Sequence, residues 1–143
     1  MGWWTTRGKF ASDKRTEEYR LLQACTTAWS RRVLHVWDRG FAGLPWLTAV
    51  VEQHQRFVMR WPGKNTLLDE QGQVRHAWEI VRGKRNWRTY RLWDARHHCF
   101  RTVGVLAASV RHPKLPDVPL WLVVSRPGHG RKPWYLLTSE PVA

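Results

Sequence analysis

Residues 33–60 read VLHVWDRGFAGLPWLTAVVEQHQRFVMR, and this stretch decides the fold. The apolar run at 33–37 predicts a buried strand, which ends where Asp-Arg-Gly-Phe predicts a turn. Apolar residues then follow a helical spacing around Pro45, a residue favoured in the first turn of a helix. Residues 56–60 predict a second strand. A strand, a helix and a strand at this spacing predict a βαβ unit with parallel strands and a right-handed crossover.

Toward the N-terminus, the sequence predicts a helix that begins near Ser12-Asp13. Acidic residues follow in its early turns, and Arg31 and Arg32 stand at its end, where cations suit the helix dipole. The apolar face of this helix is expected to comprise Leu21, Leu22, Cys25, Ala28 and Trp29.

Toward the C-terminus, the pattern changes near residue 64 to short strand-like segments separated by glycine turns, and no helix is predicted there. The expected strands are residues 73–82, 89–94, 100–110, 119–125 and 134–138. We therefore predict a mixed α+β fold, with an α/β half at residues 1–62 and an antiparallel β half at residues 63–143.

The charge of the chain favours a nucleic-acid partner. The 143 residues include 24 Lys+Arg against 11 Asp+Glu, a formal net charge of +13, and most of the excess is arginine, whose planar guanidinium suits phosphate. Anionic lipid usually takes an amphipathic basic helix, whereas these cations are scattered through strand-like segments. Without a membrane-length apolar run or a signal peptide, we expect a cytoplasmic protein with no membrane partner. Cys25 and Cys99 are expected to be reduced thiols.

Asp38 is the candidate catalytic and metal-binding residue. It ends the first predicted strand, at the edge where open α/β sheets gather carboxylates around a metal ion. From the pattern alone, an equally good interpretation is that Asp38 caps the following turn. No second acidic residue stands at a strand end in the α/β half, so no complete two-metal site is evident. Zinc ligation by His97-His98-Cys99 is not expected, because adjacent side chains of a strand point to opposite faces.

Eleven tryptophans need a role in a chain of this size. Rings among cations can stack on unpaired bases, or they can pack a thin β core beneath arginine stems. We favour core packing for any single tryptophan and expect at least one exception. The tryptophans expected in the core are Trp29, Trp46 and Trp121. Those that lie among arginines and lysines of the β half are Trp78, Trp87, Trp93 and Trp134.

Residues 35–43, HVWDRGFAG, with the strand at 56–60, resemble the second-aspartate region of bacterial insertion-sequence transposases, the cut-and-paste DDE enzymes of the insertion sequence 4 type. Residues 121–126, WLVVSR, and 133–142, PWYLLTSEPV, resemble the strand pair that follows the β insertion of that family. Trp3-Trp4 matches a region between the first and second aspartates. The resemblance covers essentially the whole chain, and the order and distance of its motifs make it more specific than Asp-Arg-Gly-Phe alone.

The resemblance implies a partial RNase H-like core with an antiparallel β-strand insertion. In the family, three carboxylates hold two Mg²⁺ ions that activate water or a 3′-hydroxyl against a DNA phosphate, and Asp38 matches the second carboxylate. The first is expected before Met1 and the third on a helix after Val142, so the resemblance implies an internal fragment that is inactive alone. For the intact parent it implies DNA transposition in the bacterial nucleoid, with transposon ends as partner and a homodimer as the acting form.

DNA contacts are expected from the basic β half and from the turn at Asp38. A rival hypothesis is a non-catalytic basic DNA-binding module, in which the β half binds DNA and Asp38 is structural. The expected DNA-binding residues are Arg39, Arg82, Lys84, Arg85, Trp87, Arg88, Arg131 and Lys132.

Overall fold

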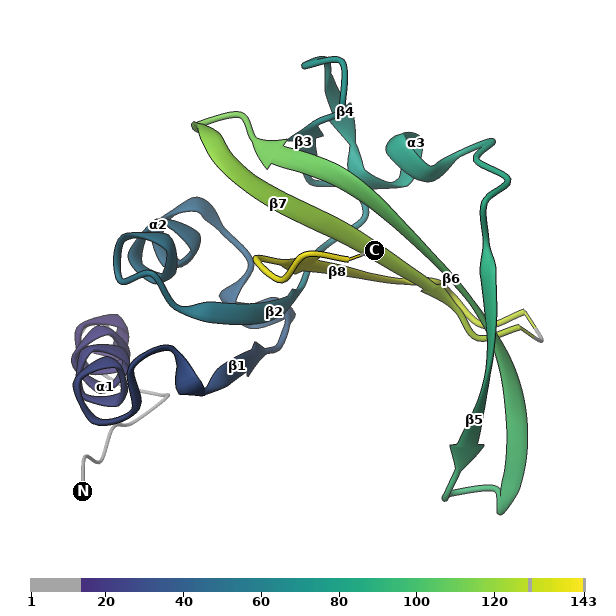
Figure 1. Cartoon of the computed structure of the whole chain (residues 1–143), viewed down its shortest axis with the longest axis horizontal. Helices are drawn as coiled ribbons and strands as arrows, with labels where there is room; N and C mark the ends of the chain where they lie inside the picture. The colour runs from purple at the N-terminus through teal and green to yellow at the C-terminus, as the bar shows by residue number, and fades with distance from the viewer. Residues whose placement is uncertain (1–13, 129, 143) are drawn as a thin grey trace.

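The computed structural model of the chain describes residues 14–128 and 130–142. These residues form one mixed sheet with helices beside it (Figure 1), in the strand order β1-β2-β8-β7-β6-β3-β4, while β5 pairs with β6 off this path. The mixed α+β class is confirmed. The strands are β1 (Leu34–Trp37), β2 (Arg56–Arg60), β3 (Thr66–Leu68), β4 (Val74–His76), β5 (Arg88–Asp94), β6 (Cys99–His112), β7 (Leu115–Arg126) and β8 (Trp134–Thr138). The helices are α1 (Lys14–Trp29), α2 (Leu44–Glu52) and α3 (Ala77–Val81), with 3-10 turns η2 (Ser30–Arg32) and η3 (Arg39–Phe41).

The expected parallel unit is formed by β1, α2 and β2. Leu34 to Trp37 pair with Arg56 to Met59 in parallel register. Pro45 stands in the first turn of α2, where its missing N–H costs no helical hydrogen bond. All other strand pairs of the described sheet are antiparallel. The prediction of a parallel unit followed by antiparallel strands is therefore confirmed.

The α/β half and the β half share this sheet, because β8 lies between β2 and β7. Side chains fix the end of β8 against the start of β2. The Arg56 guanidinium donates from Nε and Nη2 to the two Glu140 carboxylate oxygens at 2.9 and 2.7 Å. The Thr138 hydroxyl donates to the Phe57 carbonyl oxygen at 2.5 Å. The segment after β8 is thereby fixed to the parallel unit.

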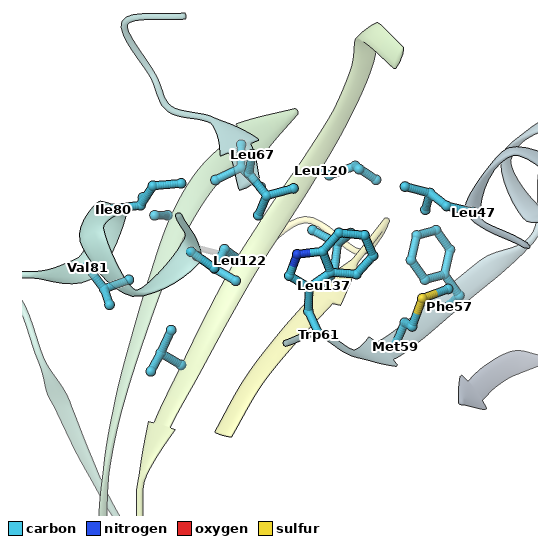
Figure 2. Close-up of a cluster of buried hydrophobic side chains, with 14 of the residues drawn as sticks. Leu47, Phe57, Met59, Trp61, Leu67, Ile80, Val81, Leu120, Leu122 and Leu137 are labelled. Carbon is cyan, nitrogen blue, oxygen red and sulfur yellow. The ribbon is translucent and has the colours of Figure 1, made fainter. Parts of the chain in front are cut away.

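One face of the sheet carries the core. Along β2, Phe57 and Met59 are buried while the residues that alternate with them are half-buried. Figure 2 shows Phe57 and Met59 near Leu47 of α2, with Ile80 of α3 at the other end of the same cluster. Truncation of such a fully buried side chain to alanine typically costs about 2–5 kcal/mol.

The apolar face expected for α1 is wrong in part. Leu22 is buried, but Leu21 is 52% and Trp29 is 53% exposed. Among the described residues β1 is the outermost strand of its sheet, so these two side chains have no further strand to pack against. Trp46 is buried as expected, whereas Trp121 is only half-buried. The expected helix start at Ser12-Asp13 and the Trp3-Trp4 match lie outside the described residues.

The strand expected at residues 73–82 is also corrected. Only Val74–His76 is strand, and Ala77–Val81 forms the helix α3, although no helix was expected in this half. A capping box begins α3, since the His76 backbone N–H donates to the Glu79 carboxylate at 2.8 Å. Ala77, Ile80 and Val81 are buried at i, i+3 and i+4. The structure also adds β3, which the sequence did not predict.

Candidate nucleic-acid interface

β5 and the first part of β6 form a two-stranded ribbon that projects from the sheet (Figure 1). The ribbon runs from the pair Arg88 and Val105 at its base to the pair Asp94 and Cys99 at its tip. Every residue of β5 except Asp94 is exposed. Both faces of the ribbon are therefore accessible, and a two-stranded β-ribbon fits the width of the DNA major groove.

One face of the ribbon combines aromatic rings with a cation. Trp93 faces Phe100 across the strands, with ring centroids 5.1 Å apart and planes inclined at 67°. The guanidinium carbon of Arg91 lies 5.1 Å from the centroid of the Phe100 ring. Trp93 is 54% and Phe100 is 60% exposed. Edge-to-face and cation–π contacts thus hold these rings in place while much of their surface stays open to a ligand.

The same ribbon face continues onto β7. Gly104 pairs with Thr89 on one side and with Arg126 on the other, which places Arg126 on this face. The guanidinium carbon of Arg126 lies 4.1 Å from the centroid of the Trp87 ring, and Trp87 Nε1 donates to the Lys84 carbonyl oxygen at 2.9 Å. Trp87 is half-buried against the core. Its ring supports Arg126, so a ligand at the ribbon base would meet the cation above it.

Two of the cations predicted to bind DNA lie in the connection from β7 to β8. Arg131 and Lys132 are both exposed there. This connection approaches the ribbon, since a Cβ atom placed on Gly128 would lie 3.9 Å from the Thr102 carbonyl oxygen. The connection therefore brings further positive charge close to the ribbon.

The remaining predicted cations of the β half are more dispersed. Arg88 is exposed on the ribbon face opposite Arg91. Arg82 lies over the Trp78 ring, 5.8 Å from its centroid, and the Lys84 ammonium lies 3.9 Å from a Glu70 carboxylate oxygen. Arg85, also exposed, lies in the segment between α3 and β5. The structure thus does not gather the predicted cations into a single cluster.

Asp38 lies at the C-terminal end of β1, at the expected edge of the parallel unit. Its carboxylate accepts a hydrogen bond from the Arg39 backbone N–H at 2.6 Å and caps η3. The side chain is 78% exposed, and Arg60 Nη1 lies 4.0 Å from Oδ1. Arg39 is exposed in η3 itself. The turn-capping role is therefore present in the structure, and the carboxylate also remains accessible to solvent.

Arg60 and Trp134 form a contact that the sequence did not predict. Arg60 ends β2, and its guanidinium carbon lies 4.4 Å from the centroid of the Trp134 ring at the start of β8. Trp134 is 51% exposed, which makes it an exception to core packing. The position of Arg60 at the same strand end as Asp38 is a sequence signal that could have identified it. Its tryptophan partner comes from the β half.

The described residues do not fit a two-metal centre by themselves. Within 14–128 and 130–142, no group of three or more His, Cys, Asp or Glu side chains is placed to hold a metal ion. At the strand end, Asp38 is a single carboxylate whose ion-pair partner is the cation of Arg60. Magnesium requires several oxygen ligands, and a pair of ions requires carboxylates shared between them.

Comparison with known proteins adds no assignment. No protein-family model matches the chain. No curated protein matches it either. In the part of the chain that the structure describes, no helix has the length and apolar character needed to cross a membrane. The ribbon, the strand-end residues and the sequence motifs are therefore the features that indicate function.

Proposed function

We propose that this chain binds DNA through the β5–β6 ribbon and the cations near its base. The observation that carries the proposal is the ribbon face on which Arg91 lies between the exposed Trp93–Phe100 pair and the Arg126–Trp87 stack. Guanidinium groups neutralise backbone phosphates, and exposed rings offer stacking surfaces to bases. The net charge of +13 supports an anionic partner and attraction to DNA of any sequence.

We further propose that the bound DNA is a transposon end and that the chain is part of a cut-and-paste transposase catalytic domain. The support is the resemblance of residues 35–43 and 133–142, together with the parallel β1–α2–β2 unit that ends at Asp38. In such an enzyme Asp38 would be one carboxylate of a Mg²⁺ centre. The other carboxylates would come from outside the described residues.

The second candidate function is DNA binding without catalysis. It is favoured by the contacts of Asp38, which caps η3 and lies 4.0 Å from Arg60. Both contacts are structural, and neither requires a metal ion. The two candidates share the ribbon and differ only in the role of Asp38.

DNA binding is tested by fluorescence anisotropy with two unrelated duplexes at 50 and 200 mM salt. The variant Arg91→Ala removes a ribbon cation, and the matched control Arg20→Ala removes an equal charge from an exposed position of α1. We expect both duplexes to bind the wild type with steep salt dependence. Arg91→Ala should weaken binding and lower the salt slope by about 1, because one phosphate contact is lost.

Three results would contradict the proposal. Absence of binding at low salt would exclude DNA as the partner. An affinity that does not change with salt would exclude an interface with backbone phosphates. Equal DNA affinities of Arg91→Ala and Arg20→Ala would show that the interface does not include the ribbon. Circular dichroism of each variant checks that the fold is retained.

A further inference from the structure

The tip of the ribbon, residues 94–99, is organised by one carboxylate. Asp94 Oδ1 accepts the backbone N–H groups of Arg96 and His97, each at 3.1 Å. Asp94 Oδ2 lies 3.0 Å from His97 Nδ1 and 2.5 Å from Arg101 Nε. The Asp94 side chain is only 18% exposed, so it is enclosed by the groups that it binds. The tip is therefore a shaped turn with cationic and imidazole groups around an anion.

The two imidazoles of this turn are exposed. His97 faces Asp94, and His98 makes an edge contact with the Trp93 ring, with ring centroids 6.4 Å apart. His98 also has a backbone φ of 48°, which turns the chain from β5 into β6. An imidazole ordinarily takes up its proton as the pH falls from 8 to 5. The charge of the tip therefore depends on whether these two imidazoles carry protons.

The charged groups around the two imidazoles set the net charge of the tip. The titratable and charged groups at the tip are Asp94, Arg96, Cys99 and Arg101, and Arg91 follows on the Trp93 face. Burial alone would raise the pKa of the Asp94 carboxyl. Hydrogen bonds from His97 and the charge of Arg101 outweigh burial and hold this pKa below its usual value. Asp94 thus stays anionic, and protonation of both histidines raises the tip from a charge of +1 to +3.

We propose that the ribbon tip is a phosphate-binding site whose affinity for DNA is set by the protonation of His97 and His98. This inference rests on the proposed DNA-binding function and assigns it a pH-dependent component. With both imidazoles neutral, the guanidinium groups of Arg96 and Arg101 are offset in part by Asp94. With both protonated, His97 neutralises Asp94 more fully, and His98 adds a cation beside Trp93. The tip then attracts backbone phosphates more strongly.

The experiment measures duplex affinity at pH 8.0, 7.0, 6.0 and 5.5 in 50 mM salt, with a pH-insensitive dye on the DNA. The test variant combines His97→Gln with His98→Asn, because asparagine tolerates a positive φ better than most residues other than glycine. The control is His54→Asn, which replaces an exposed histidine of similar backbone conformation in the turn between α2 and β2. Circular dichroism at each pH confirms the fold.

We expect the wild type and His54→Asn to gain about tenfold in affinity between pH 8.0 and 5.5, as expected for one or two added phosphate contacts. The double variant should gain less than about twofold over the same interval, because it lacks both imidazoles. A wild type without pH dependence, or a double variant that keeps the full gain, would overturn the inference and leave DNA binding intact. Absence of binding at every pH would overturn the proposed function together with this inference.

Discussion

The guanidinium carbon of Arg60 lies 4.4 Å from the centroid of the Trp134 ring. The two residues come from neighbouring strands, since Arg60 pairs with Leu136, two residues from Trp134 on the same face of β8. Arg60 Nη1 also lies 4.0 Å from Asp38 Oδ1. The Trp134 ring of the β half thus helps to hold the Arg60 guanidinium beside the Asp38 carboxylate of the α/β half. This arrangement places a phosphate-attracting group next to Asp38.

Arg60→Gln should weaken duplex binding and lower its salt slope by about 1 if Arg60 contacts a phosphate. Trp134→Leu should weaken binding less, because it removes a cation–π contact of about 0.5–1 kcal/mol while keeping the charge. Anisotropy at several salt concentrations measures both effects. Arg111→Gln, which removes an exposed cation near the far end of β6, is the matched control. Equal binding by Arg60→Gln and Arg111→Gln would exclude Arg60 from the interface.

Trp93→Ala should reduce affinity for single-stranded DNA by about 1–3 kcal/mol, because a base that stacks on the exposed ring loses its platform. Trp29→Ala is the matched control, since Trp29 is 53% exposed on α1 and Trp93 is 54% exposed on the ribbon. Neither change should lower the melting temperature much, because both rings are largely in solvent. Similar affinities of the two variants for an oligothymidine strand would show that Trp93 stacks on no base.

Local patterns were sufficient to predict the parallel unit. The apolar run at 33–37, the helix with Pro45 in its first turn and the run at 56–60 each carry their own periodicity, and the structure confirms all three as elements. The expected burial of the first strand is wrong, because every residue of β1 is exposed or half-buried. The helix α3 is not predicted because its five residues span less than two turns, too short a run for a helical repeat to stand out. Its start depends on the His76–Glu79 capping box. A side-chain contact of this kind outweighs a weak strand pattern.

The features that the sequence could not predict depend on contacts between elements that are distant in the sequence. Trp29 and Leu21 lie on the apolar face of α1, yet they stay exposed because the described sheet ends at β1. The contact of Arg60 with Trp134 depends on the return of β8 to β2, and no local spacing reports such a pairing. Asp38 was predictable as a strand-end carboxylate. Its two roles, turn cap and metal ligand, were not separable from the sequence.

Glu140→Gln should lower the melting temperature at pH 7, because it breaks the paired hydrogen bonds with Arg56. The hydrogen bond from Arg56 lowers the pKa of the Glu140 carboxyl, burial opposes this, and the charges of Arg56 and Arg31 lower it further. A carboxyl with a lowered folded-state pKa stabilises the fold above its unfolded pKa and loses this effect as the pH falls through its folded pKa. The difference between wild type and variant should therefore shrink toward pH 3. A difference that stays constant from pH 7 to 3 would contradict this assignment.

Val36→Lys should reduce self-association of the chain. Among the described residues β1 is the outermost strand, and its Val36 is 75% exposed, so unpaired backbone groups lie beside an apolar side chain. Lysine on an edge strand opposes pairing with a second copy. Sedimentation velocity at rising concentration should show association of the wild type and less of it in the variant. Val74→Lys is the control, on the strand at the opposite end of the sheet, and a monomeric wild type would contradict the prediction.

Asp38→Asn separates the two roles of Asp38, because asparagine keeps the turn cap but lacks the charge that a metal ion needs. A capping side chain is worth about 0.5–2 kcal/mol at a helix start, with asparagine and aspartate nearly equal. We therefore expect Asp38→Asn to melt close to the wild type and Asp38→Ala to melt lower.

The 143-residue chain should neither nick nor join DNA with Mg²⁺ or Mn²⁺, since its described strand end offers one carboxylate beside a cation. In a longer chain that supplies the carboxylates implied by the resemblance, Asp38→Asn should abolish cleavage and leave DNA binding nearly intact. Normal cleavage by that variant would show that Asp38 acts only as a turn cap. Nicking by the 143-residue chain that disappears in Asp38→Asn would show that a single described carboxylate suffices.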